Sequence, residues 1–201
     1  MKFYPSFNNP PNFNDICYVW DKYDGSSICC EFNKSGAKKF GSKTVLIDET
    51  HNILGEAPTL IKTKYEKDII EIMKKNRLES ITCYFEFFGE NSEFGVHQQE
   101  KHDIILFDCF VPKIGIIDSK EFIRMFGKLD IPNLVHVGKV NKEFIDNIWN
   151  SNIEGVSKEG VVCKGKYYKR LNAPYMFKLK TKLWIDRLKE IKSPEEFEEL
   201  K

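Results

Sequence analysis

The segment 21–26, with the sequence D-K-Y-D-G-S, constrains the fold of this 201-residue chain more than any other. It follows an apolar run at 16–20 that is typical of a buried strand. Asp24-Gly25 favours a tight turn, and 28–32 then has the pattern of a returning strand. The sequence therefore predicts a hairpin that holds Lys22 near its bend, with a carboxylate on either side. Taken alone, the segment has a simpler interpretation, a solvated lysine beside an ordinary turn.

The composition limits the class of protein. With 41% hydrophobic and 30% charged residues, the chain is neither disordered nor membrane-embedded in character, and its length suits one domain, 1–201. Its apolar runs are shorter than the roughly 20 residues that a transmembrane helix needs. The N-terminus has no apolar signal core, so we expect an intracellular, cytoplasmic protein, or one of the host cytoplasm if it is viral.

Cysteine and histidine do not form a recognisable metal motif. The six cysteines lie in apolar strand-like runs, where a free thiol behaves as a small hydrophobe, and none forms a C-x-x-C pair. A structural zinc site is therefore not expected. His97 and His102 flank a polar loop and are interpreted as surface residues.

Hydrophobic periodicity predicts a mixture of strands and helices. Beyond the hairpin, strands are expected at 45–47, 81–89, 103–108, 134–137, 159–164 and 175–180. Helices are expected at 60–75, at 119–128, where Ser119 is the expected cap, and at 141–149. The strands at 81–89 and 103–108 are expected to pair. Ser193 has the pattern of a capping box that starts a terminal helix. The fold class is α+β.

Charged residues inside two of these strands point to a ligand. Glu86 lies in the strongly aromatic strand 81–89, where burial of a carboxylate without a partner is costly. Lys178 and Lys180 are two residues apart, so they share one strand face while Phe177 and Leu179 face the core. Two adjacent ammonium groups favour a shared anion, and the segment 158–182 is basic enough to face phosphates.

Five short motifs follow one another along the chain. They are K-x-D-G at Lys22, E-F-F-G at Glu86, L-F-D at Phe107, E-G-V-V at Glu159 and K-L-K at Lys178. The series resembles the collinear motifs of the covalent nucleotidyltransferase superfamily, the ligases and capping enzymes that form a lysyl–nucleotide intermediate. One such motif is weak, whereas five in order at plausible separations are specific.

Within that superfamily the sequence is most similar to ATP-dependent RNA ligases. Ser27 stands where DNA ligases and capping enzymes usually carry arginine. The resemblance implies a nucleotidyltransferase (adenylyltransferase) domain of antiparallel sheets with flanking helices and a nucleotide cleft. It also implies a short helical C-terminal tail, no OB-fold domain, and a monomer that acts in RNA repair by joining RNA 5′-phosphate and 3′-hydroxyl ends.

The resemblance assigns the central chemistry to three lysines and a carboxylate. Lys22 is the expected nucleophile, which ATP converts to lysyl-AMP, and Lys178 and Lys180 are expected to hold the α-phosphate. Glu159 is expected to help bind Mg²⁺ or Mn²⁺. A lysine attacks phosphorus only as a neutral amine, so we expect these cations to lower the pKa of Lys22.

Further roles follow from the matched positions. Glu86 is expected to hold the ribose hydroxyls, Phe107 to stack on adenine and Asp21 to read the adenine edge. Asp24, with Gly25 of the same motif, is expected to order the lysine and the metal waters. Lys43 stands where many relatives have an arginine near the ribose or the RNA 5′-phosphate.

Two alternatives remain at this stage. One is another enzyme of the superfamily, a minimal ATP-dependent DNA ligase or a GTP-dependent capping-type enzyme. The other is a degenerate, non-catalytic module that binds nucleotides or nucleic-acid ends. The intact lysine and the carboxylates of the motifs argue against the second.

Overall fold

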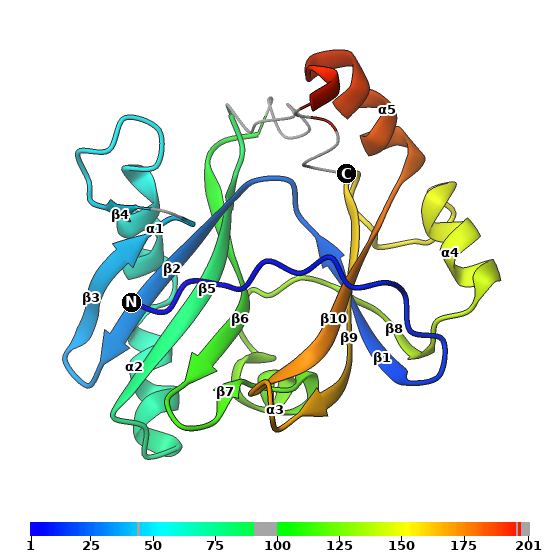
Figure 1. The fold of residues 1–201 in the computed structure, drawn as a ribbon. Helices are drawn as coiled ribbons and strands as arrows, with labels where there is room; N and C mark the ends of the chain where they lie inside the picture. Colours follow the sequence, from blue (N-terminus) through cyan, green and yellow to red (C-terminus); the bar gives the residue numbers. More distant parts are fainter. Residues whose placement is uncertain (44, 91–99, 196, 198–201) are drawn as a thin grey trace.

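The computed structural model describes residues 1–43, 45–90, 100–195 and 197, and in this part of the chain ten strands form two antiparallel sheets (Figure 1). The four-stranded sheet has the order β10 (Ala173–Lys180), β9 (Gly160–Tyr168), β1 (Ile16–Lys22) and β8 (Leu134–Lys139). The six-stranded sheet has the order β4 (Leu46–Ile47), β3 (Gly36–Gly41), β2 (Ser26–Asn33), β5 (Ser80–Phe88), β6 (Asp103–Val111) and β7 (Gly115–Ile116).

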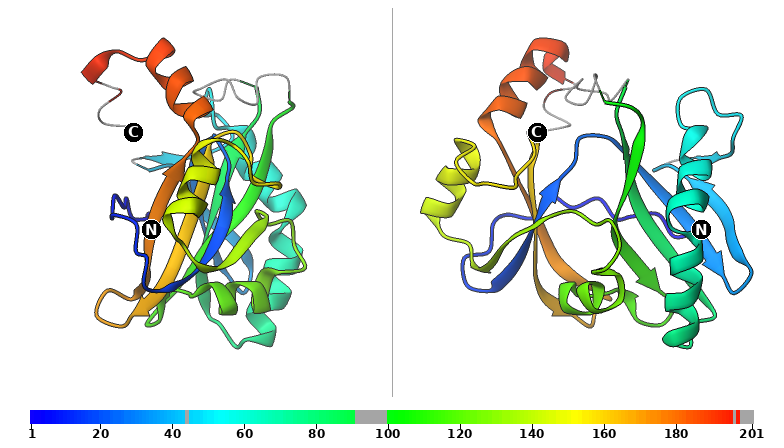
Figure 2. Two further views of the ribbon diagram at one scale, coloured as in Figure 1. Left: turned by 90° about the vertical axis from the view of Figure 1, so that its right-hand side faces the viewer. Right: turned by 180° about the vertical axis from the view of Figure 1, so that it is seen from behind.

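Helices cover the outer faces of the sheets. The helices α1 (Glu56–Lys64) and α2 (Glu66–Lys75) lie behind the six-stranded sheet in Figure 1 and in front of it in the right-hand view of Figure 2, with α3 (Ser119–Phe126) near the lower end of the sheet. The helix α4 (Lys142–Trp149) packs beside β9 and β10, and α5 (Lys182–Ile191) continues from the end of β10. Among the described residues, no helix is long and apolar enough to cross a membrane.

Each sheet has its own apolar core. Ile61, Ile69 and Met73 of α1 and α2 are fully buried against the six-stranded sheet. Ile148 of α4 packs in a smaller core against the four-stranded sheet, which includes Phe177. Because side chains alternate along a strand, the residues between these core positions face away from the helices.

The predicted hairpin around Lys22 is wrong. β1 ends in the four-stranded sheet, where Lys22 lies opposite Gly160 of β9, and β2 begins in the six-stranded sheet, where Ser26 lies opposite Phe87 of β5. The Asp-Gly turn therefore carries the chain from one sheet to the other. A Cβ at Gly25 would lie 2.3 Å from the Phe87 carbonyl oxygen, so only glycine fits this crossing.

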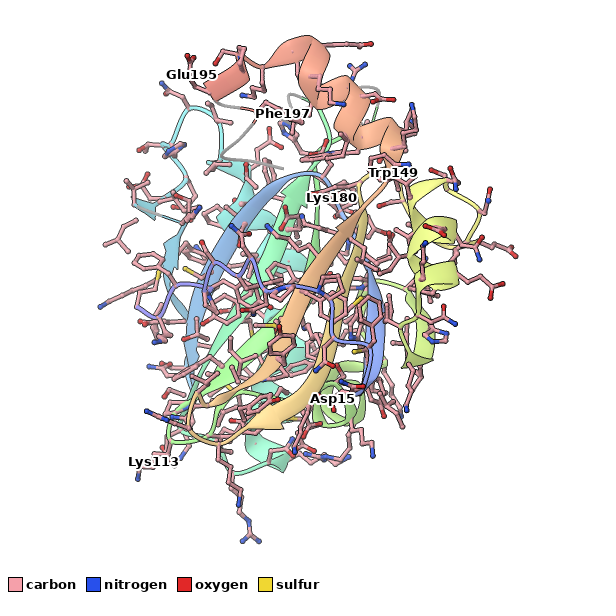
Figure 3. The ribbon with its side chains drawn as sticks, turned by 45° about the vertical axis from the view of Figure 1, so that its right-hand side comes forward. Asp15, Lys113, Trp149, Lys180, Glu195 and Phe197 are labelled. Carbon is pink, nitrogen blue, oxygen red and sulfur yellow. The ribbon has the colours of Figure 1, made fainter. Side chains whose placement is uncertain are left out.

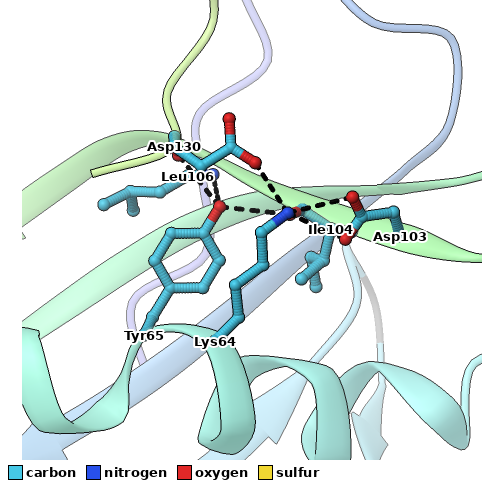
Figure 4. Close-up of polar contacts among 6 residues, drawn as sticks. All are labelled: Lys64, Tyr65, Asp103, Ile104, Leu106 and Asp130. Atoms are coloured by element: carbon cyan, nitrogen blue, oxygen red, sulfur yellow. Dashed lines mark hydrogen bonds and ion pairs between the residues drawn. The ribbon is translucent and has the colours of Figure 1, made fainter. Parts of the chain in front are cut away.

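The helix predicted at 60–75 is divided into two, because Tyr65 leaves helical geometry at φ −128°. The buried Tyr65 hydroxyl lies within hydrogen-bond distance of the Ile104 and Asp130 carbonyl oxygens and accepts from the Leu106 amide (Figure 4). Both halves of the segment carry apolar residues at helical spacing, so periodicity alone did not reveal the break.

The neighbouring Lys64 joins α1 to the start of β6 and to the loop before β8. Its Nζ lies 2.9 Å from both carboxylate oxygens of Asp103 and 2.6 Å from Asp130 Oδ2 (Figure 4). The same loop leads to Asn133, whose carbonyl accepts from the Asp21 amide at 2.9 Å. The contacts of Lys64 therefore help to hold the backbone next to Lys22.

Several further sequence expectations have clear outcomes. β5 and β6 pair as predicted, and the helix predicted at 141–149 is α4, which Asn141 caps. The cap of α3 is Asp118, which accepts from the Glu121 amide, and not Ser119. All six cysteines are free and buried. His97 lies outside the described residues. The same holds for Glu196, a residue of the capping box predicted from Ser193.

A buried ion pair joins the two sheets. Lys164 of β9 and Asp108 of β6 lie 2.7 Å apart, with 4% and 0% of their side chains exposed. Lys164 also donates to the Phe107 carbonyl at 3.2 Å, and the same Asp108 oxygen accepts from the Tyr4 hydroxyl at 2.8 Å. Because both charges are desolvated, each depends on the other for compensation.

This pair predicts an asymmetric response to mutation. Lys164→Met leaves a buried carboxylate without its counter-charge and should lower the free energy of unfolding by about 3–5 kcal/mol, while Lys164→Met/Asp108→Leu should recover part of the loss. Urea denaturation measures both. Lys34→Met is the matched control, because the Lys34–Glu79 pair is exposed and should contribute no more than about 1 kcal/mol. Equal losses in Lys164→Met and Lys34→Met would contradict the interpretation.

Candidate active site

A cleft of about 550 Å³ lies where the two sheets meet, and every site residue predicted from the sequence lines it. β1, the crossing and the β3–β4 connection contribute Asp21, Lys22, Asp24, Gly25 and Lys43. β5, β6, the residue before β9, and β10 contribute Glu86, Phe107, Glu159, Lys178 and Lys180. Residues that are far apart in the sequence therefore share one cavity.

Strand register brings the predicted lysines to Glu159. Lys22 of β1 and Lys180 of β10 both lie opposite Gly160 of β9, on its two sides, and Glu159 immediately precedes β9. Lys22 Nζ lies 2.9 Å from Glu159 Oε1, and the Lys180 ammonium donates to the same oxygen. The buried Glu159 carboxylate thus sits between two ammonium groups.

Lys178 lies on the same strand face as Lys180, as predicted. Phe177 and Leu179 are buried in the core on the other face. Among the described residues, Lys178 makes no ion pair, and its Nζ lies 5.7 Å from the ring centroid of Phe7. The K-L-K strand therefore presents one lysine bound to a carboxylate and one without a counter-charge.

The expected lowering of the Lys22 pKa is not what this structure gives. Burial is the largest influence on Lys22 and lowers the pKa of its ammonium group. The nearby carboxylates of Glu159, Glu86 and Asp24 raise the pKa and outweigh burial. The pKa of Lys22 therefore lies above its ordinary value. Lys22 in this arrangement keeps its proton at neutral pH.

The pKa values of Lys178 and Lys180 shift in the opposite direction. Burial is the main cause that lowers the pKa of Lys180 to about 8, against the opposing charge of Glu159. Burial and the charge of Lys22 also lower the pKa of Lys178. Lys22, Lys178 and Lys180 are therefore not equivalent as acids.

Glu86 has the most informative pKa in the cleft. Burial among aromatic residues raises it from 4.5 to about 7, and the charges of Glu159 and Asp24 add to the increase while Lys22 opposes it. The carboxylate inside an aromatic strand, which the sequence singled out, therefore keeps its proton to a higher pH than an ordinary glutamate.

Asp21 holds a neighbouring loop. Its carboxylate accepts from the Ser157 amide at 2.6 Å, and the Ser157 hydroxyl donates to the Lys22 carbonyl at 2.8 Å. Burial raises the pKa of Asp21, although these hydrogen bonds oppose the increase. The motif residue therefore fixes the segment that leads to Glu159.

The sequence did not predict the contribution of the N-terminal segment. Residues 3–7 line the cleft, and Figure 1 shows this segment crossing in front of both sheets. The Tyr4 ring packs edge-on against Phe107 with 5.0 Å between centroids, and it lies 4.9 Å from Tyr84. Tyr4 therefore supports the half-buried Phe107 from outside the sheet.

Trp184 and Lys164 are also lining residues that motif spacing missed. Lys180 Nζ lies 3.7 Å from the centroid of the Trp184 ring, which is a close cation–π contact. The signals available were an aromatic residue four positions after the K-L-K motif and a lysine inside an apolar strand. Neither signal shows, without the fold, which residues Trp184 and Lys164 contact.

The fold is shared with a known ligase. No protein-family model and no curated protein sequence matches the chain. Among solved structures, a Naegleria gruberi RNA ligase variant with AMP and Mn superposes with a TM-score of 0.66 at 15% identity, over 89% of this chain and 53% of that one. A variant with ATP and Mn gives 0.66 at 17% identity, and the ligase with PPi gives 0.63 at 15%. The chain spans about half the length of these ligase chains.

The pKa of Glu86 predicts how stability depends on pH. Because its pKa is raised on folding, the folded state binds more protons between pH 4.5 and about 7, and the wild type should lose stability as pH rises through this window. Glu86→Gln lacks this dependence, so its stability relative to the wild type should increase from pH 5 to 8. Urea denaturation at several pH values measures the difference.

Glu49 provides the control for that series. Its exposed carboxylate pairs with Lys62, which lowers its pKa, so Glu49→Gln should not gain on the wild type as pH rises. A difference between Glu86→Gln and the wild type that stays constant from pH 5 to 8 would contradict the assignment.

Proposed function

We propose that this chain is an ATP-dependent RNA ligase that joins RNA 3′-hydroxyl and 5′-phosphate ends through a Lys22–AMP intermediate. The observation that supports this most is the convergence of five collinear motifs in one cleft, with Lys22 beside Lys178, Lys180 and Glu159. The likeness of fold to an RNA ligase supports the same proposal.

The first step uses the Lys22 amine as nucleophile. Neutral Nζ attacks the α-phosphorus of ATP, a phosphorus–nitrogen bond forms, and the bond to the leaving pyrophosphate breaks. In the second step an RNA 5′-phosphate oxygen attacks the same phosphorus and releases Lys22. In the third step a 3′-hydroxyl attacks the RNA phosphorus, and AMP leaves.

Deprotonation of Lys22 requires a change in its surroundings. Glu159, Glu86 and Asp24 hold its pKa up, and Glu159 Oε1 at 2.9 Å is a close acceptor for its proton. The carboxylate of Glu159 fits a Mg²⁺ or Mn²⁺ ion, since both prefer oxygen ligands, and such an ion would supply positive charge against these carboxylates. Water-mediated contacts suit this site, because the described residues contain no cluster of three metal-ligand side chains.

The remaining residues bind and orient the substrates in this proposal. Lys178 and Lys180, which we call the clamp lysines or the clamp, neutralise charge on the transferring phosphate, which stabilises the transition state more than the bound substrate. Phe107 stacks on adenine with Tyr4 behind it. Glu86 binds the ribose hydroxyls, Asp21 contacts the adenine edge, Asp24 orders Lys22, and Lys43 faces the ribose or the RNA 5′-phosphate.

Formation of the adduct tests the first step directly. Incubation with ATP and divalent metal should increase the intact mass by one AMP, and Lys22→Ala should show no increase because the amine is absent. ATP should label the protein in preference to GTP, and nicked RNA should be sealed in preference to nicked DNA. A folded wild-type protein without any adduct would overturn the ligase proposal.

Variants of the clamp lysines test charge neutralisation. Lys178→Ala and Lys180→Ala should slow single-turnover adduct formation by about a hundredfold or more, because the lost charge acts in the transition state. Lys→Arg should restore only part of the rate, since guanidinium differs in shape and hydration. Lys166→Ala, on the exposed part of β9, is the control. Melting temperatures identify unfolding, and wild-type rates in both alanine variants would refute the clamp.

A further inference from the structure

A second cavity, of about 600 Å³, adjoins the cleft and has no assigned role. Residues of the N-terminal segment, α4, β10 and α5 line it, including Asn8, Ile145, Trp149, Ile185 and Lys189. Figure 3 shows Trp149 and Lys180 in the region where α4, α5 and the end of β10 approach one another. We refer to this cavity as the Trp149 groove.

The Trp149 groove and the cleft share two lining residues, the clamp lysines. Lys178 and Lys180, which share one face of β10, line both cavities. Among the described residues, Lys178 has no carboxylate partner, so its charge is available to an anion at the junction. A phosphate bound there would have the cleft on one side and the groove on the other.

The lining combines positive charge with an aromatic surface. Three of the described lining residues are lysines and none is acidic. Trp149 is 39% exposed at the end of α4, and Ile145 and Ile185 are only partly buried. Lys189 has 56% of its side chain exposed and lies 3.6 Å from Asp186, a weak surface pair.

This chemistry fits a nucleotide better than a free anion or a peptide. Exposed aromatic rings bind unstacked bases, and nearby lysines bind the backbone phosphates, which is how proteins recognise single strands. A small inorganic anion would leave Trp149 and the isoleucines without a contact. An apolar peptide would leave the lysines without counter-charges.

We propose that the Trp149 groove binds single-stranded RNA next to the end that is joined. The base of a nucleotide beside the 5′-phosphate stacks on Trp149, its backbone phosphate contacts Lys189, and the terminal phosphate reaches Lys178. This inference rests on the proposed ligase function, because it takes the clamp as the site of the reacting phosphate. It adds the path along which the RNA leaves that site.

Fluorescence anisotropy with a short, 3′-labelled, 5′-phosphorylated RNA tests the groove without any chemical step. Trp149→Ala should weaken binding by about tenfold or more, and Trp149→Phe should keep most of it, because stacking needs only an aromatic face. Tyr168→Ala is the control, since Tyr168 has a similar exposure of 38% but lies at the far end of β9. Melting temperatures exclude unfolded variants.

The salt dependence of RNA binding by two variants of α5, Lys189→Ala and Lys182→Ala, provides the second test. Lys189→Ala should lower the slope of log Kd against log salt by about 0.7, the loss of one phosphate contact on a single strand. Lys182→Ala is matched, because Lys182 is on α5, pairs with the same Asp186 and has 58% side-chain exposure, but is not a lining residue. It should leave the slope unchanged.

The outcomes separate this inference from the ligase proposal. Equal RNA binding by the wild type, Trp149→Ala and Lys189→Ala would overturn the groove, even if Lys22 forms the AMP adduct. Wild-type binding weaker than about 100 µM, the weak limit of non-specific binding, would also overturn it. Absence of the adduct in wild type that binds RNA through Trp149 would refute the ligase and leave the groove as an RNA site.

Discussion

The geometry of the cleft depends on the backbone pairing at Gly160. β1 and β10 pair with opposite edges of β9, and this pairing sets Lys22 and Lys180 on either side of the same residue. Register in a ladder changes only in whole residues, and a shift of one would turn both lysines to the opposite face. A Cβ at position 160 would lie 2.1 Å from the Leu179 carbonyl oxygen, and φ is +142°. The backbone pairing of β1, β9 and β10 therefore sets the positions of Lys22 and Lys180.

Electrostatics then divide the residues of the cleft into unlike groups. Burial penalises every charge, yet the pKa of Lys22 is raised while that of Lys180 is lowered, because Lys22 has more carboxylates around it. For Glu86, burial outweighs the opposing charge of Lys22, and its pKa is raised. Lys22 thus keeps its proton at neutral pH, whereas Lys180 and Glu86 release theirs closer to neutral pH than an ordinary lysine or glutamate does.

Local patterns in the sequence predicted those features that depend on neighbours along the chain. The alternation of Lys178 and Lys180 with apolar residues gave the correct strand face, because the period of a strand is a local property. The hairpin failed, since Asp-Gly indicates a turn but not which strand each arm joins. The position of Tyr4 could not be predicted either, because it depends on Asp108, 104 residues away. The Lys22 pKa likewise depends on carboxylates from other strands.

The reactivity of the buried cysteines can report local unfolding of each sheet. Two belong to the four-stranded sheet and four to the six-stranded sheet: Cys17 and Cys163, and Cys29, Cys30, Cys83 and Cys109. Burial raises the pKa of every one of these thiols, so few are in the reactive thiolate form while the fold is closed. Local opening of one sheet would expose its thiols and not those of the other. The order in which alkylating reagents modify these positions therefore reports which half of the molecule loosens first.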